Sequence, residues 1–254
     1  MIELRNVSAG YNGRQIIKNI NLSFKTGKVT VILGPNGCGK STLIKTALGL
    51  IPKSEGKILY DDTEISSMKP REIAHHAAYL SQSRNVPHIT AGKMVLHGRF
   101  PYLGYPRKYR QEDYEAVRKA MQQADCLQLS SCRMEQLSGG QRQKIYLAMA
   151  LAQNTETVFM DEPTTFLDVR HQLETMEVAE SLAADGKAAV LVLHDLGLAL
   201  KTADEAVLMD EGKILQAGSP EAIFESGRLG EVFGVRVCRV AAENGWQYYC
   251  EACK

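Results

Sequence analysis

Three short segments of this 254-residue chain carry the residue types that hold and cleave phosphate groups. The first has the spacing GxxxxGK[ST] and reads Gly34-Pro35-Asn36-Gly37-Cys38-Gly39-Lys40-Ser41-Thr42. Its glycines let successive backbone N–H groups turn toward an anion, and the helix that follows adds its positive N-terminal end. Lys40 supplies a positive charge for the β- and γ-phosphates of ATP, and the Ser41 hydroxyl is a ligand for Mg²⁺. Cys38 fills the loop and is given no chemistry of its own.

A second segment is an apolar run that ends in two neighbouring carboxylates, Val158-Phe159-Met160-Asp161-Glu162. The run predicts a buried strand whose carboxyl end lies beside the glycine-rich loop. Asp161 would then hold the Mg²⁺ shell, and Glu162, one residue further, would polarise an attacking water. A strand that happens to end in an acidic turn would explain these residues equally well if they stood alone. Together with the phosphate loop, they favour a hydrolytic site.

The third segment is Leu137-Ser138-Gly139-Gly140-Gln141, directly before a helical pattern. Ser138 is a favourable N-cap, but an N-cap alone does not require two glycines. Glycines at this point leave the backbone N–H groups and the helix end open to a phosphate. The chain therefore carries two phosphate-binding motifs on separate segments. This predicts that ATP is bound between two copies of the protein.

The expected strands and helices place these segments in a suitable framework. Residues 29–33 form a short, almost wholly apolar strand, which is typical of a sheet covered on both faces, and residues 41–50 after the glycine-rich loop have helical spacing. Further strands are expected at 2–5, 16–24, 56–60, 77–80, 157–161, 188–193, 205–210 and 213–217. Further helices are expected from about 70 and at 90–97, 111–124, 140–152, 169–184 and 196–202.

The segment 89–154 differs from the rest because it lacks clear strands. We therefore expect residues 1–254 to form one α/β unit rather than two independent domains. Residues 1–88 and 155–254 would form its ATP-binding core, with a β subdomain and the C-terminal tail, and 89–154 a helical subdomain that carries Ser138. The tail from Gly218 onward is expected to be ordinary packing.

Composition and charge argue against several classes of function. The formal net charge is +1, so the chain lacks the basic field of many nucleic-acid binders and no such partner is expected. No apolar run approaches the roughly 20 residues that span a bilayer, and the chain begins as a strand with no signal peptide, so a cytosolic protein is expected. Cys250 and Cys253 have CxxC spacing without a second pair of ligands, which favours free thiols on a terminal strand over a zinc site.

The third segment resembles the signature motif of the ATP-binding-cassette (ABC) ATPases, where it faces the γ-phosphate bound by the other subunit. The resemblance extends over nearly the whole chain. It implies an α/β fold with a P-loop NTPase core, an N-terminal antiparallel β subdomain and a helical signature subdomain. It also implies ATP and Mg²⁺ as ligands, and ATP hydrolysis by a homodimer.

Three single residues and one short segment also match the ABC family. The resemblance implies that Tyr11 stacks on adenine, although a strand tyrosine packed for burial is the alternative. It implies that Gln82, at the end of a strand, senses Mg²⁺ and the attacking water, and that Phe166-Leu167-Asp168 is the D-loop that crosses to the opposite subunit. His194 matches the switch histidine that contacts the γ-phosphate. The other histidines, at positions 75, 76, 88, 97 and 171, are given no role.

The organisation of the chain narrows the kind of ABC protein. A single cassette without membrane helices or a long coiled coil suggests the energy-coupling subunit of an importer. Residues 96–102 and 161–172 resemble the ATPases of importers for iron siderophores, haem and cobalamin. The expected partners are a second copy, an integral membrane permease dimer and, indirectly, an extracytoplasmic substrate-binding protein. The chain would then lie on the cytoplasmic face of the membrane, held there by the permease.

Residues 99–102 are expected to form an exposed docking surface for a cytoplasmic helix of the permease, with a plain surface loop as the alternative. Two other functions would use the same ATP-handling residues. One is a soluble ABC ATPase of an iron–sulfur cluster assembly complex, and the other is an importer for metal ions or another nutrient.

Overall fold

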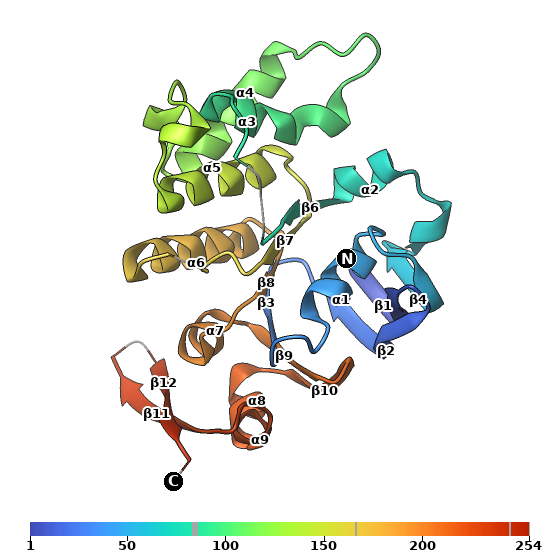
Figure 1. Ribbon diagram of the computed structural model, residues 1–254, viewed down its shortest axis with the longest axis vertical. Coiled ribbons are helices and arrows are strands. Elements are labelled where there is room, and N and C mark those ends of the chain that lie inside the picture. Colours follow the sequence, from blue (N-terminus) through green and yellow to red (C-terminus); the bar gives the residue numbers. More distant parts are fainter. Residues whose placement is uncertain (83–85, 166, 244, 254) are drawn as a thin grey trace.

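A six-stranded sheet forms the centre of the molecule (Figure 1). The computed structural model describes residues 1–82, 86–165, 167–243 and 245–253. In sheet order the strands are β10 (Lys213–Gly218), β9 (Glu205–Asp210), β3 (Lys28–Leu33), β8 (Ala188–Val192), β7 (Thr157–Asp161) and β6 (Ala77–Leu80). All neighbours are parallel except β10, which pairs with β9 in the antiparallel sense. The carboxyl ends of β3, β6, β7 and β8 therefore point to the same edge of the sheet.

Side-chain alternation along the strands builds a separate core on each face of this sheet. On β3, Val29, Val31 and Leu33 pack into one core, whereas Ile32 packs into the other. The first core contains the faces of α6 (Val169–Ala184) and α7 (Leu196–Thr202), and the second contains α1 (Lys40–Ala47). Strands buried on both faces read as continuous apolar runs, which is why the sequence predicts them well.

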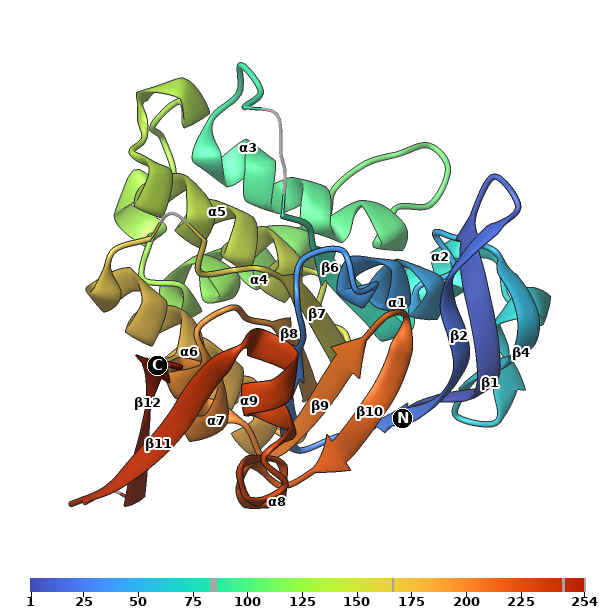
Figure 2. The ribbon, with the colours of Figure 1, turned by 60° about the horizontal axis from the view of Figure 1, so that its bottom comes forward.

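An antiparallel sheet of four strands forms the N-terminal subdomain (Figure 2). In sheet order these strands are β2 (Arg14–Phe24), β1 (Ile2–Tyr11), β4 (Lys53–Tyr60) and β5 (Thr63–Glu64). Phe24 on β2 meets Phe159 on β7 edge to face, with ring centroids 5.2 Å apart. Through this contact the subdomain packs against the central sheet.

Helices make up the segment that lies between β6 and β7 in the sequence. They are α3 (Ala91–Leu96), the 3₁₀ turn η2 (His97–Tyr102), α4 (Gln111–Gln123), the turns η3 (Leu127–Leu129) and η4 (Met134–Gln136), and α5 (Gly139–Ala152). The turn η1 (Ile65–Ser67) and α2 (Pro70–His76) precede them, between β5 and β6. The expected α/β core with a β subdomain and a helical segment is confirmed.

The C-terminal tail has more structure than the sequence indicated. Helices α8 (Pro220–Glu225) and α9 (Arg228–Phe233) lead into a hairpin of β11 (Val235–Ala242) and β12 (Gly245–Ala252). The hairpin packs against α7, where a Cβ added at Gly197 would lie 2.7 Å from the Tyr248 carbonyl oxygen. Cys250 lies in β12, and both it and Cys253 are free thiols.

Arg99 is buried, so the predicted exposed docking surface is wrong for this residue. Its side chain is almost inaccessible and pairs with Asp113 of α4, Nε to Oδ1, at 2.9 Å. It also donates to the Ala152 carbonyl and lies over the ring of Tyr102. Phe100, the next residue, remains 48% exposed. Arg99 therefore ties η2 to α4 and α5 inside the helical segment.

Replacing Arg99 with alanine should lower the free energy of unfolding by about 3 kcal/mol, because it leaves Asp113 buried without its partner. Denaturant titration followed by circular dichroism measures this change. Arg110→Ala is the matched control, since its pair with Glu112 spans 3.6 Å between largely exposed side chains and should contribute far less. Equal losses in the two variants would contradict a structural role for the buried pair.

Candidate functional site

The glycine-rich loop connects the end of β3 to the start of α1. Gly34 has φ +154°, and a Cβ there would lie 2.3 Å from the Met209 carbonyl oxygen. Gly39 has φ +109° and lies directly before α1, where a Cβ would press on Ile17 of β2. Both positions therefore exclude side chains, so only glycine lets the loop take this path.

The side chain of Lys40 lies inside this loop. Its Nζ donates to the carbonyl oxygens of Gly34 and Pro35, at 2.7 and 2.8 Å, and the residue is 6% exposed. The loop thus curls around a buried ammonium group. A positive charge beside backbone N–H groups and a helix N-terminus is suited to binding phosphate.

Three oxygen-bearing side chains meet beside the start of α1. The Ser41 hydroxyl donates to Asp161 Oδ1 over 3.0 Å, and the Tyr79 hydroxyl donates to Oδ2 over 3.1 Å. Asp161 ends β7 and is almost fully buried. Hydroxyl and carboxylate oxygens are the donors that Mg²⁺ prefers, so the pair Ser41–Asp161 fits this ion.

Glu162 is the point on which three neighbouring side chains converge. Gln82 donates from Nε2 to Oε2 at 2.5 Å, and His194 Nε2 lies 2.7 Å from Oε1. The Thr165 hydroxyl also donates to Oε2 at 3.2 Å. Glu162 itself has φ +52°, a left-handed conformation that is uncommon for a residue with a side chain. The backbone therefore turns sharply after Asp161, and the two carboxylates have separate sets of partners.

The order of the strands explains this convergence. Gln82 follows β6, Glu162 follows β7 and His194 follows β8, and these three strands are adjacent and parallel. Residues after parallel strands meet at one edge of the sheet, where α/β folds usually bind ligands. The sequence predicted each of these residues separately, and the order of the strands places them close together.

Tyr11 is exposed at the end of β1, beside the turn to β2. The alternative of a tyrosine packed for burial is thus wrong. Ile17, on the other strand of this hairpin, is the residue nearest to a Cβ added at Gly39. The hairpin therefore lies against the phosphate loop, which is compatible with a role for Tyr11 near a base.

The signature segment begins α5. The Ser138 hydroxyl accepts from the Gln141 backbone N–H at 3.2 Å, and the Gln141 side chain accepts from the Ser138 N–H at 3.0 Å. This reciprocal pair is a capping box, so Ser138 is the N-cap that the sequence predicts. In Figures 1 and 2, α5 and α1 lie on different sides of the strands β6 and β7.

The two signature glycines have different surroundings. A Cβ added at Gly139 would meet nothing within 4 Å, whereas one at Gly140 would lie 3.4 Å from three atoms of the His171 ring. Gly139 therefore presents open backbone, as the sequence led us to expect for both glycines. Gly140 instead makes room for a side chain of its own chain.

Asp168 is the N-cap of α6 and accepts the His171 backbone N–H at 2.9 Å. Leu167 precedes it, and Phe166, the first residue of the predicted D-loop, lies outside the described residues. Sequence reasoning missed Tyr79, Thr165 and His171, which contact Asp161, Glu162 and Asp168. Thr165 and His171 each follow their carboxylate by three positions in the sequence, and this short spacing is the one signal that could have suggested them. Tyr79 has no such signal.

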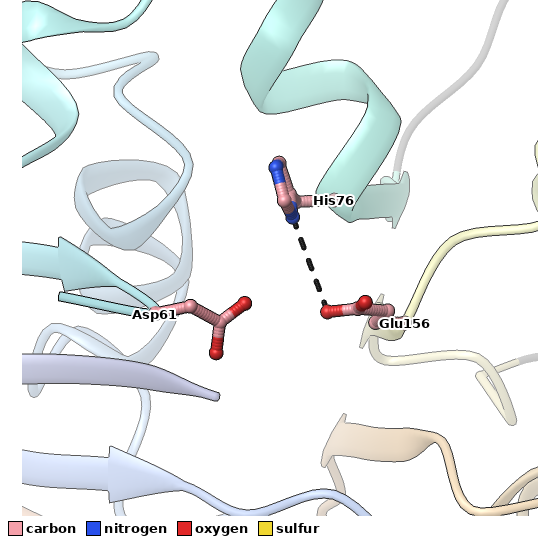
Figure 3. A group of neighbouring side chains, drawn as sticks. All are labelled: Asp61, His76 and Glu156. Atoms are coloured by element: carbon pink, nitrogen blue, oxygen red, sulfur yellow. Dashed lines mark ion pairs between the residues drawn. The ribbon is translucent and has the colours of Figure 1, made fainter. Parts of the chain in front are cut away.

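A second group of ligand-type side chains lies at the other end of β7 (Figure 3). It consists of Asp61, His76 and Glu156, whose ligand atoms lie within 4.8 Å of one another. His76 and Glu156 form an ion pair at 3.9 Å, and both carboxylates are more than half exposed. Asp61 is already paired with the N-terminal amine. We therefore assign the group to surface ion pairing.

Comparison with known proteins identifies the family. The ABC transporter family model matches residues 17–165. The achromobactin transport ATP-binding protein of Dickeya dadantii is 36% identical over 244 residues, which cover 95% of this chain and 90% of that protein. The chain belongs to the ABC transporter family. The resemblance on which the ATPase assignment was based is thereby confirmed.

Two further similar proteins also have names that describe ATP-binding proteins of transport or import. The ferric enterobactin transport ATP-binding protein of Escherichia coli is 36% identical, over 91% of this chain and 86% of that protein. The hemin import ATP-binding protein of Thermobifida fusca is 35% identical, over 92% of this chain and 82% of that protein.

Solved structures agree with the assigned ABC fold. A metal-chelate type ABC transporter in an inward-facing conformation superposes with a TM-score of 0.85 at 23% identity, covering 98% of this chain and 97% of that chain. An ATP-binding cassette in a dimeric post-hydrolysis state, bound to ADP and phosphate, gives 0.76 at 27% identity over 87% of this chain and 99% of that one. Within the described residues, every helix is too short or too polar to cross a bilayer.

Proposed function

We propose that this chain is the ATP-hydrolysing subunit of an importer for an iron chelate, haem or cobalamin, working with a separate membrane permease. The observation that carries this proposal is similarity over more than 90% of the chain to ATP-binding proteins named for achromobactin, ferric enterobactin and hemin. These names favour iron chelates and haem within the proposed range. The convergence of Gln82 and His194 on Glu162 supports hydrolysis as the activity.

The glycine-rich loop would bind the triphosphate of ATP. Its backbone N–H groups and the N-terminus of α1 would face the phosphates, and Lys40 would neutralise the β- and γ-phosphates. Ser41, Asp161 and Gln82 would hold Mg²⁺, which when bound neutralises charge on the phosphate oxygens. The exposed ring of Tyr11 would stack on adenine.

Glu162 would act as the base for the attacking water. Both of its carboxylate oxygens have partners in this structure, so one of these contacts must give way when a water takes its place. The carboxylate would then accept a proton from the water as the oxygen attacks the γ-phosphorus and ADP leaves. Gln82 would orient the water, and His194 would donate to the transferring phosphoryl group.

The signature segment would complete the site of a second copy. Gly139 presents open backbone at the N-terminus of α5, which is suited to a phosphate oxygen. The similarity to a cassette seen as a dimer with ADP and phosphate supports this arrangement. Residues 137–141 and Asp168 would thus act on ATP held by the partner, and loss of phosphate would release the dimer.

Coupling to transport requires partners outside this chain. A homodimer of the chain would bind a permease dimer at the cytoplasmic face of the membrane, and a substrate-binding protein would deliver the chelate on the other side. Phe100 and the residues after Gln82 are candidates for permease contact, although residues 83–85 lie outside the described part of the chain. The transported compound would not touch the ATPase.

Co-purification tests this proposal against its alternatives. A tagged chain extracted from detergent-solubilised membranes should bring down an integral membrane permease, because the proposed work is transport. Soluble scaffold proteins in its place would favour the iron–sulfur assembly ATPase, which the names of the relatives do not favour. A permease whose transport assays show uptake of another nutrient would contradict the iron-chelate assignment while leaving the ATPase role intact.

A further inference from the structure

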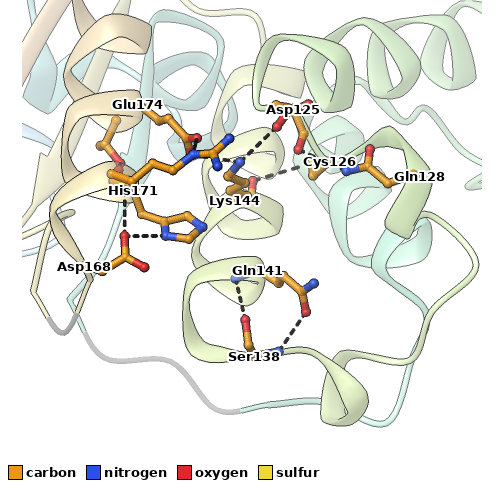
Figure 4. A network of polar contacts seen from close by, with 11 residues as sticks. Asp125, Cys126, Gln128, Ser138, Gln141, Lys144, Asp168, His171 and Glu174 are labelled. Atoms are coloured by element: carbon orange, nitrogen blue, oxygen red, sulfur yellow. Dashed lines mark hydrogen bonds and ion pairs between the residues drawn. The ribbon is translucent and has the colours of Figure 1, made fainter.

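His171 was given no role from the sequence, yet it contacts two segments assigned to the dimer interface. It lies in the first turn of α6 and projects between Asp168 and the turn that carries Ser138 and Gln141 (Figure 4). Its Nδ1 is 2.7 Å from Asp168 Oδ1, the same oxygen that accepts the His171 backbone N–H. One residue therefore holds this carboxylate oxygen with both its backbone and its side chain.

These contacts matter because the Asp168 side chain is otherwise little restrained. It is 67% exposed, and an exposed N-cap side chain can adopt several rotamers. The hydrogen bonds from His171 hold the pKa of Asp168 below its usual range. The two contacts from His171 therefore fix the orientation of the carboxylate.

The His171 ring also lies against the signature helix. Three ring atoms, Cδ2, Cε1 and Nε2, are the nearest neighbours of a Cβ added at Gly140, each at 3.4 Å. A side chain larger than a methyl group at Gly140 would collide with this ring. The ring thus lies between Asp168 and the first turn of α5.

Lys144 and Gln143 of α5 also make polar contacts with the catalytic core, further from the signature turn than His171. Lys144 pairs with Glu174 of α6 at 2.9 Å, and the Gln143 side chain donates to the Pro163 carbonyl at 2.7 Å. Gln143, Lys144 and Glu174 line a cavity of about 380 Å³ between the two helices, which leaves the α5–α6 interface incompletely packed. At the loop end of that interface, His171 supplies the polar link to Asp168.

We propose that His171 is a positioning residue that presents Asp168 and the signature turn together to the nucleotide of the partner subunit. The proposal rests on the proposed function, since both segments matter only if a second copy closes over them. His171 acts through Asp168 and Gly140 rather than on the nucleotide itself. Its donated hydrogen bond fixes the carboxylate, while its ring lies beside Gly140 at the start of α5.

A comparison of two amides tests this role. Asparagine carries its amide group on Cγ and can place a donor where His171 has Nδ1, whereas the amide of glutamine lies one bond further out, near the position of Nε2. Both replacements and His171→Ala are made in the Glu162→Gln background. Sedimentation velocity in saturating Mg-ATP then gives the dimer dissociation constant of each variant, and titration of dilute protein with a fluorescent ATP analogue gives its nucleotide affinity.

His171→Ala and His171→Gln should each raise the dimer dissociation constant about tenfold, the effect of losing one charge-assisted hydrogen bond. His171→Asn should stay within about threefold of the parent, and nucleotide affinity should be equal in all of them. Dimerisation of the glutamine variant at parental strength would overturn the proposal, as would an asparagine variant as weak as the glutamine one. The two amide variants remain decisive if the alanine variant folds poorly. A Glu162→Gln parent that stays monomeric would instead refute the closure model itself.

Discussion

The Glu162→Gln variant should bind Mg-ATP within a few-fold of the wild-type affinity but turn it over at least about 100-fold more slowly. Glutamine has nearly the shape of glutamate, and its single carbonyl oxygen can still accept from Gln82 while its amide nitrogen faces His194. It cannot accept a proton from water, so the chemical step loses its base. Steady-state release of phosphate measures turnover, and an ATP-binding titration measures affinity.

Blocked hydrolysis should also trap the closed state. With saturating Mg-ATP, sedimentation velocity should show dimers of the Glu162→Gln variant and mostly monomers of the wild type after its ATP is consumed. Glu180→Gln is the matched control, because Glu180 is an exposed carboxylate on α6 and its loss should leave both readings unchanged. Monomers alone in the trapped variant would contradict the two-copy clamp.

The sequence predicts best those parts of the fold in which a single physical requirement, such as burial or lack of space, determines the residue type at a position. The central strands are covered on both faces, so they read as apolar runs, and β3, β7 and β8 lie where the pattern places them. Gly34 and Gly39 are glycines because the loop backbone excludes a Cβ there. Local rules of this kind can be read from a single sequence.

Contacts between segments that lie far apart in the sequence could not be predicted from the sequence alone. Arg99 looked like a surface residue because arginine is usually exposed, and its burial depends on Asp113 and the Ala152 carbonyl, which lie 14 and 53 positions away. His171 looked like an ordinary helix residue because Gly140 reaches it only through the packing of α5 on α6. The C-terminal hairpin is half exposed, and among the described residues its two strands pair only with each other, so its periodic signal is weak.

Removing the Lys40 ammonium group should reduce ATP affinity at least about 100-fold, the largest binding effect expected for a single residue of the site. Lys40→Met keeps the length and apolar stem of the side chain, so it removes the charge with little change in volume. The positive charge is buried within the phosphate loop, where water screens it less than at the surface. Titration with a fluorescent ATP analogue measures the loss.

The loop itself also depends on Lys40, so stability must be measured in parallel. Without the ammonium group the carbonyl oxygens of Gly34 and Pro35 lose their donor, at a cost of about 1–2 kcal/mol in the free energy of unfolding. Lys45→Ala is the matched control, because Lys45 is a lysine one turn further along α1, outside the phosphate loop. A Lys40→Met protein that is folded and still binds ATP at wild-type strength would show that the triphosphate is held elsewhere. A loss of binding in a folded Lys40→Met protein, with Lys45→Ala unaffected, would locate the phosphates at the end of β3.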